Sequence, residues 1–220
     1  MILEIDNVEL YFKEKRILNG IYLKAEIGKI TGILGSNGCG KSCLLKIIFG
    51  DLISKYKLIR IDGKPILKPL YQTGFVSYLP QHYFIPNNLN TKTAFKLFHV
   101  DWNDFINAFP SFALYENLKF NKLSGGERRV MEVYLILKSS SNIILLDEPF
   151  SHIAPLYIEK IISLIETEKH KKAIIITDHM YQHIVDVSDS IYLLKNGWSK
   201  LINNLKELED YKYLSMGSID

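Results

Sequence analysis

One segment of eight residues constrains the fold of this chain more than any other. Residues 35–42 read Gly-Ser-Asn-Gly-Cys-Gly-Lys-Ser, which is a glycine, four residues and then Gly-Lys-Ser. The apolar run 30–34 before it has the character of a strand buried on both faces, and the apolar run 44–49 after it that of a short buried helix. A glycine-rich loop between a buried strand and a helix is typical of a phosphate-binding site.

The composition of this loop suits the terminal phosphates of a nucleoside triphosphate. Glycines let the backbone bend so that its N–H groups point inward, and the helix N-terminus adds a partial positive charge. We expect Lys41 to reach the β- and γ-phosphates and the Ser42 hydroxyl to coordinate Mg²⁺. A glycine-rich turn without a ligand is the alternative, which the order of strand, loop and helix disfavours. The predicted nucleotide contacts of this segment are Gly35, Ser36, Asn37, Gly38, Cys39, Gly40, Lys41, Ser42 and Cys43.

Two adjacent carboxylates follow a second buried strand. The apolar run 143–146 ends in Asp147 and Glu148. Ligands of parallel sheets bind beyond the carboxyl ends of the strands, which is where these side chains would meet the metal of the phosphate loop. We expect Asp147 to hold Mg²⁺, directly or through water, and Glu148 to accept a proton from an attacking water. The alternative is a pair of solvated acids at a strand end.

The order of the predicted elements indicates an α/β fold. Alternation in 3–10 and 21–27 predicts a small antiparallel sheet, whereas later buried strands at 75–79, 143–146, 173–176 and 191–194 alternate with helical patterns at 124–137 and 155–168. This order predicts a parallel sheet covered by helices on both faces. The aromatic-rich stretch 91–122 reads as short helices. We predict one domain over 1–220, with a core of about 1–90 and 141–220 and an inserted helical subdomain of about 91–140.

Composition restricts the class of protein further. Hydrophobic residues make up 47% and charged residues 23%, and the formal net charge is +3, so we expect a globular domain without a nucleic-acid partner. No apolar run approaches the roughly 20 residues of a membrane span, and the first residues are acidic where a signal peptide is basic. We therefore expect a cytoplasmic protein. The basic run 169–172 is expected at a solvated helix end.

A third motif distinguishes among the families of proteins that contain a phosphate loop. Residues 123–127, Leu-Ser-Gly-Gly-Glu, resemble the signature of the ATP-binding cassette (ABC) ATPases. Ser124, Gly125 and Gly126 would cap the following helix and offer a second helix N-terminus to a phosphate. The resemblance implies a P-loop NTPase with a RecA-like core that binds ATP and Mg²⁺. It also implies a dimer in which the signature of each protomer contacts the ATP held by the other.

Other positions carry the same resemblance. Phe12, placed 23 residues before Gly35, matches the aromatic residue that stacks on adenine in this family, with a core role as the alternative. Gln81 matches the glutamine that touches Mg²⁺ and the attacking water. His179 matches the histidine that reaches the γ-phosphate. The catalytic set implied is Lys41, Gln81, Glu148 and His179, and the metal set is Ser42, Gln81 and Asp147. His183 is expected on a helix surface.

The resemblance also bears on the biological role. The strings 147–150 and 177–179 look most like those of the cassettes of lipopolysaccharide-export and branched-chain amino-acid transport systems. They imply a transporter ATPase subunit on the cytoplasmic face, partnered by a second cassette and an integral membrane subunit. Alternatives are a soluble non-transport ABC ATPase, for example in cofactor assembly, and a nucleotide-binding regulator without turnover. Ala154 stands where the family usually carries an aspartate that crosses to the partner.

Overall fold

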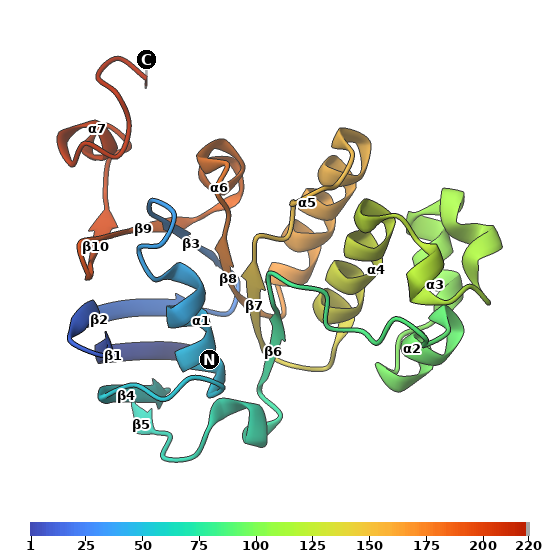
Figure 1. The fold of residues 1–220 in the computed structure, drawn as a ribbon, viewed down its shortest axis with the longest axis horizontal. Coiled ribbons are helices and arrows are strands. Elements are labelled where there is room, and N and C mark those ends of the chain that lie inside the picture. Colours follow the sequence, from blue (N-terminus) through green and yellow to red (C-terminus); the bar gives the residue numbers. More distant parts are fainter. Residues whose placement is uncertain (219–220) are drawn as a thin grey trace.

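A six-stranded sheet forms the centre of the molecule (Figure 1). The computed structural model describes residues 1–218. The strand order is β10-β9-β3-β8-β7-β6, and every neighbouring pair is parallel except β9 and β10. The strands are β3 (Ile30–Leu34), β6 (Val76–Leu79), β7 (Ile143–Asp147), β8 (Ala173–Thr177), β9 (Ser190–Lys195) and β10 (Trp198–Ile202).

Both faces of this sheet are covered, which explains its apolar strands. In β7, Ile144 and Leu146 belong to the core beneath the helices, whereas Ile143 and Leu145 belong to the core on the opposite face. A strand buried on both sides has no polar face, so its sequence shows no alternation. The helices of the first face are α4 (Gly125–Lys138), α5 (Pro155–Lys169) and α6 (Tyr181–Val187).

The second face is covered by one helix and a second sheet. Helix α1 (Lys41–Phe49) packs there together with a four-stranded antiparallel sheet of order β2-β1-β4-β5 (Figure 1). The predicted antiparallel sheet is confirmed, and it covers this face together with α1. Its strands are β1 (Ile2–Phe12), β2 (Lys15–Glu26), β4 (Tyr56–Ile61) and β5 (Lys64–Pro65). The last two were not predicted.

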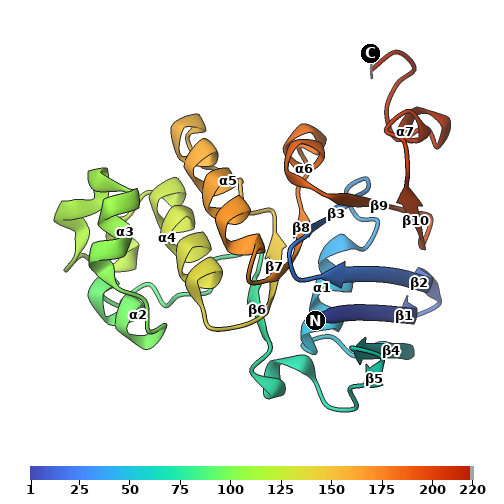
Figure 2. The ribbon, with the colours of Figure 1, turned by 180° about the vertical axis from the view of Figure 1, so that it is seen from behind.

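Short helices fill the aromatic-rich stretch. They are α2 (Thr91–Leu97), α3 (Trp102–Ala108) and the 3₁₀ helices η2 (Pro110–Tyr115) and η3 (Phe120–Lys122). Phe105 lies at their centre, with ring centroids 4.9 to 5.2 Å from those of Phe95, Phe109, Phe112 and Tyr134. Figure 2 shows α2 and α3 beyond α4, on the side away from the antiparallel sheet. This arrangement supports our proposal of an inserted helical subdomain.

A small helix, α7 (Glu207–Asp210), follows β10 and packs through the buried Leu208. No helix within residues 1–218 has both the length and the apolar character needed to cross a membrane.

Candidate nucleotide-binding and hydrolysis site

The phosphate loop joins β3 to α1 in a conformation that requires glycine. Gly40 is the N-cap of α1 and has a φ of 108°. A Cβ on Gly35 would lie 2.5 Å from the carbonyl oxygen of Leu194, so a larger residue there would clash with backbone. These two positions fix the path of the loop over the carboxyl end of β3.

The loop closes around its own lysine. Lys41 is 6% exposed, and its Nζ donates to the carbonyl oxygen of Gly35 and, at 3.3 Å, to that of Ser36. The ammonium group therefore lies inside the loop, against two of its carbonyl groups. A bound phosphate would offer stronger, charge-assisted bonds to the same ammonium.

Asp147 ends β7 beside the loop and accepts three hydroxyl hydrogen bonds. The donors are Ser42 Oγ at 3.1 Å, Thr177 Oγ1 at 3.2 Å and Tyr78 Oη at 3.0 Å. The side chain is nearly inaccessible to solvent, and burial raises its pKa despite the hydrogen bonds that lower it. Ser42 and Asp147 together present the oxygen donors that Mg²⁺ prefers, so the residues fit this ion. Gln81 is not among the contacts of this pair.

Glu148 is the centre of a second group. Its Oε2 accepts from Gln81 Nε2 at 3.0 Å and from Ser151 Oγ at 3.4 Å, and it lies 3.9 Å from His179 Nδ1. His179 Nδ1 also lies 3.2 Å from Asp178 Oδ1, and the His179 side chain is half exposed. Three of the predicted catalytic side chains, Gln81, Glu148 and His179, therefore meet at one point.

A single cavity of about 690 Å³ connects this group with the phosphate loop. Phe12 stands at its rim and is 49% exposed, which disfavours the core role. Two other predicted contacts, Ser36 and Cys39, line a smaller adjoining cavity with Lys15 and Arg16. The larger cavity is lined by Phe12, Ile17, Asn37, Gly38, Gly40, Lys41, Ser42, Cys43, Gln81, Glu148 and His179.

The signature turn does not line this cavity in its own chain. Ser124 is exposed and caps α4 through a capping box with Glu127. A Cβ on Gly125 would lie 2.6 Å from Tyr83 Oη, and one on Gly126 would lie 2.5 Å from the carbonyl oxygen of His152. Gly125 and Gly126 therefore pack closely against the segments of Tyr83 and His152, while Ser124 is exposed to solvent.

The structure corrects two interpretations of single side chains. His183 is half buried instead of lying on the helix surface, with its ring centroid 5.0 Å from that of Phe150 and its Nδ1 without a hydrogen-bond partner. Lys172 is buried and donates to the carbonyl oxygens of Leu137 and Ser139, so it is not solvated.

Sequence reasoning also missed supporting residues of the site. Tyr78 and Thr177 hold Asp147, and both stand near motif residues, three before Gln81 and two before His179. Their polarity within apolar strands was the available signal. Arg129 is a third supporting residue, since its guanidinium donates to the carbonyl oxygens of Asp147 and Glu148. It carried no such signal, because an arginine after a helix start is ordinarily solvated.

Comparison with known proteins shows the family of this chain. The ABC transporter family matches residues 18–151. The chain belongs to this family. It is 30% identical to Archaeoglobus fulgidus LivF, a protein named for branched-chain amino acid transport, over 95% of this chain and 96% of LivF. It is 28% identical to LptB of Haemophilus influenzae, named for lipopolysaccharide export, over 89% of this chain and 88% of LptB.

Solved structures agree on the fold. An ATP-binding subunit of an ABC transporter superimposes with a TM-score of 0.81 at 20% identity, covering 97% of this chain and 94% of that chain. A nucleotide-free ABC transporter cassette gives a TM-score of 0.76 at 23% identity over 97% and 96%. The α/β P-loop fold is confirmed. The chain is an ABC ATPase, and its relatives favour the transporter subunit over the soluble alternative.

Proposed function

We propose that two copies of this chain bind two MgATP between them and that hydrolysis drives a membrane-embedded partner. The observation that carries the proposal is the single cavity that reaches from Phe12, through Lys41, to Glu148 and His179. Phe12 would stack on the adenine, the loop would hold the phosphates, and the far end would receive the attacking water.

The hydrolytic step follows from the residues at that far end. Water attacks the γ-phosphorus, Glu148 Oε2 accepts its proton, and the bond from the γ-phosphorus to the bridging oxygen breaks to give ADP and phosphate. Gln81 and His179 lie beside the Glu148 carboxylate and would orient the water. Lys41 would offset charge on the transferred group. Mg²⁺, when held by Ser42, Asp147 and Gln81, would supply Lewis-acid stabilisation of the phosphate oxygens.

The dimer accounts for the exposed signature turn. Ser124, Gly125 and Gly126 lie outside their own nucleotide cavity, at the N-terminus of a long helix. A helix N-terminus attracts phosphate through its free N–H groups and its dipole. The turn would therefore complete the site of a second copy.

A membrane subunit and the cytoplasmic face are the remaining parts of the proposal. They are supported by the names of relatives such as LivF and LptB, which are transport components. The chemical identity of the transported molecule is not inferred from these residues.

Phosphate release tests the assignment of the base. Purified protein with MgATP should release phosphate, and Glu148→Gln should lower kcat at least about 100-fold while ATP still binds, because an amide cannot accept the proton. Lys41→Ala should weaken ATP binding itself. Equal phosphate release by wild type and Glu148→Gln would contradict the proposal and favour the regulator without turnover.

A further inference from the structure

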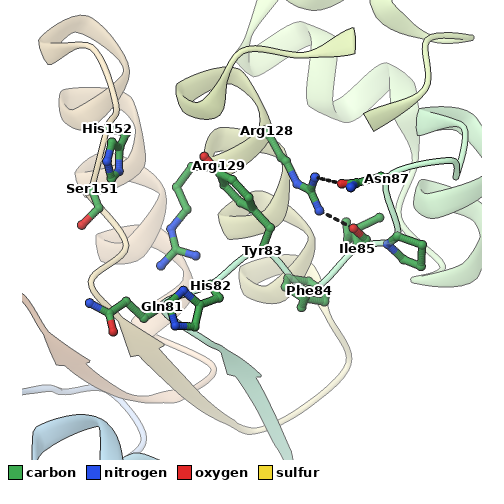
Figure 3. A pocket seen from close by; sticks show the side chains of 11 residues that line it. Gln81, His82, Tyr83, Phe84, Ile85, Asn87, Arg128, Arg129, Ser151 and His152 are labelled. Carbon is green, nitrogen blue, oxygen red and sulfur yellow. Dashed lines mark hydrogen bonds between the residues drawn. The ribbon is translucent and has the colours of Figure 1, made fainter. Parts of the chain in front are cut away.

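A buried arginine lies directly behind the proposed catalytic carboxylates. Arg129, in the first turns of α4, is 2% exposed. Its Nη1 donates to the carbonyl oxygen of Pro80 at 2.7 Å, and its Nη2 donates to those of Asp147 at 2.6 Å and Glu148 at 2.9 Å. Figure 3 shows the side chain extending from α4 toward the segment of Gln81. One guanidinium thus joins the backbone of Pro80, which precedes Gln81, to the backbone of Asp147 and Glu148.

The backbone at Glu148 is unusual and depends on such support. Its φ is 52°, in the left-handed region that side-chain-bearing residues rarely adopt. Such conformations cost about 1–3 kcal/mol and persist where the surroundings fix them. The Glu148 N–H donates to the carbonyl oxygen of Thr177 at 2.9 Å, and Arg129 holds its carbonyl group. Hydrogen bonds to both the N–H and the carbonyl group of Glu148 therefore hold the backbone conformation from which its carboxylate extends.

We propose that Arg129 is a positioning residue for hydrolysis, fixing Glu148, Asp147 and Gln81 relative to one another from the signature helix. The inference rests on the proposed role of Glu148 as the base. The 3.0 Å hydrogen bond between Gln81 and Glu148 joins two segments whose backbones Arg129 also ties together. Because α4 carries the signature turn at its start, this arginine also connects the surface offered to a second copy with the base of its own site.

The neighbouring Arg128 provides a matched comparison. It is also buried, at 6% exposed, and its guanidinium donates to Glu132 Oε1 at 3.1 Å. It donates as well to Asn87 Oδ1 at 2.5 Å and to the carbonyl oxygen of Ile85 (Figure 3). Its contacts are as numerous as those of Arg129, but none reaches Asp147, Glu148 or Pro80. Losing Arg129 leaves the carbonyl groups of Pro80, Asp147 and Glu148 without this donor. Losing Arg128 leaves the buried Glu132 carboxylate and the carbonyl group of Ile85 without theirs, so Arg128→Gln should destabilise the fold at least as much as Arg129→Gln.

The experiment compares Arg129→Gln with Arg128→Gln in the full chain. We would measure kcat for phosphate release, the Kd of mant-ATP and the thermal midpoint of each variant. We expect Arg129→Gln to lower kcat at least about tenfold with Kd within about threefold of wild type, because small misplacements of reacting groups are costly while the phosphate loop is untouched. Arg128→Gln should lower the thermal midpoint at least as much and keep kcat within about threefold.

Two outcomes would overturn the inference. Equal losses of kcat in both variants would make Arg129 a structural residue only, and an unchanged kcat in Arg129→Gln would remove it from the mechanism. Should Arg129→Gln not fold, Arg129→Lys replaces it, since a lysine keeps the charge but lacks the planar fork that spans several carbonyl groups, and the same two outcomes apply.

A Glu148→Gln arm in the same assay separates this inference from the proposed function. If Glu148→Gln keeps kcat, the assignment of the base is wrong, and the inference falls with it. If Glu148→Gln loses kcat while Arg129→Gln keeps it, only the inference is wrong.

Discussion

Asp147 is held in a buried environment that opposes its charge. Burial raises its pKa above the ordinary value of 3.8, although three hydroxyl groups donate to the carboxylate. The native state therefore binds this proton more tightly than the unfolded chain does. The resulting stabilisation is complete below about pH 3.8 and is lost as pH rises through the native pKa. At neutral pH the ionised carboxylate destabilises the fold in the absence of a cation.

Asp147→Asn should therefore raise stability while abolishing function. Without nucleotide or Mg²⁺, we expect its thermal midpoint to exceed that of wild type at pH 7, because the amide avoids burying a charge. The difference should shrink as pH falls through the raised pKa of the wild-type carboxyl, because the protonated carboxyl no longer buries a charge. Thermal denaturation of both proteins across this pH range checks the prediction. A lower midpoint for Asp147→Asn at pH 7 would show that the carboxylate stabilises the fold.

Phe12 is exposed enough for its role to be tested without loss of the fold. Stacking of a base on an aromatic ring contributes about 1–3 kcal/mol, so Phe12→Ala should weaken mant-ATP binding at least about fivefold, and Phe12→Trp should restore it. Phe75→Ala is the control, since Phe75 is 38% exposed and does not line the cavity. An unchanged Kd in Phe12→Ala would remove the ring from the nucleotide site.

At the scale of elements, helix α4 begins with a capping box and with the exposed signature turn. The Ser124 side chain accepts from the Glu127 N–H at 3.3 Å, while Glu127 Oε2 accepts from the Ser124 N–H at 2.8 Å. Burial acts to raise the pKa of Glu127, but these bonds and the Tyr115 hydroxyl outweigh it and lower the pKa. The carboxylate form that completes the cap is thus favoured.

Ser124→Ala should destabilise the chain by about 1 kcal/mol without nucleotide, since an N-cap side chain is lost. Chemical denaturation measures this change. Ser163→Ala, at an exposed position inside α5, should change stability by less than about 0.5 kcal/mol. Equal effects of the two substitutions would mean that the cap contributes nothing.

The sequence best predicts those elements whose residues all share one environment, such as strands in which every residue is buried. Buried parallel strands such as β3 and β7 are continuous apolar runs, and the phosphate loop is specified by its own glycines and lysine. The strand β10 was missed because it is an edge strand of mixed polarity, and β4 because it carries two basic residues among its apolar ones. Their pairing depends on distant partners, which local patterns do not reveal.

Among single residues, those of the candidate site that lie in motifs were predicted from the sequence, and those that support them were not. Lys41, Asp147 and Glu148 lie in recognisable strings, and the structure brings Gln81 and His179 to Glu148 as expected. Arg129 is buried only because the carbonyl groups of two distant segments converge on it. Such convergence depends on tertiary packing and has no local sequence pattern.

At the scale of the whole molecule, the phosphate loop and the signature turn lie in different parts of the chain. The phosphate loop sits next to the antiparallel sheet and α1, while the signature turn belongs to α4 on the other side of the central sheet (Figure 1). Each chain therefore carries two glycine-containing helix N-termini that do not share a cavity. Two copies in opposite orientation would pair the loop of one with the turn of the other, which a closed twofold interface permits.

The most direct test of this account is the mass of the Glu148→Gln protein with MgATP, measured by size-exclusion chromatography with light scattering. We predict a dimer, because ATP is bound without being hydrolysed, and a monomer when Gly125→Asp is added, since a carboxylate in the turn would repel the phosphate of the partner's ATP. A monomer in Glu148→Gln with saturating MgATP, or a dimer unaffected by Gly125→Asp, would contradict the shared site.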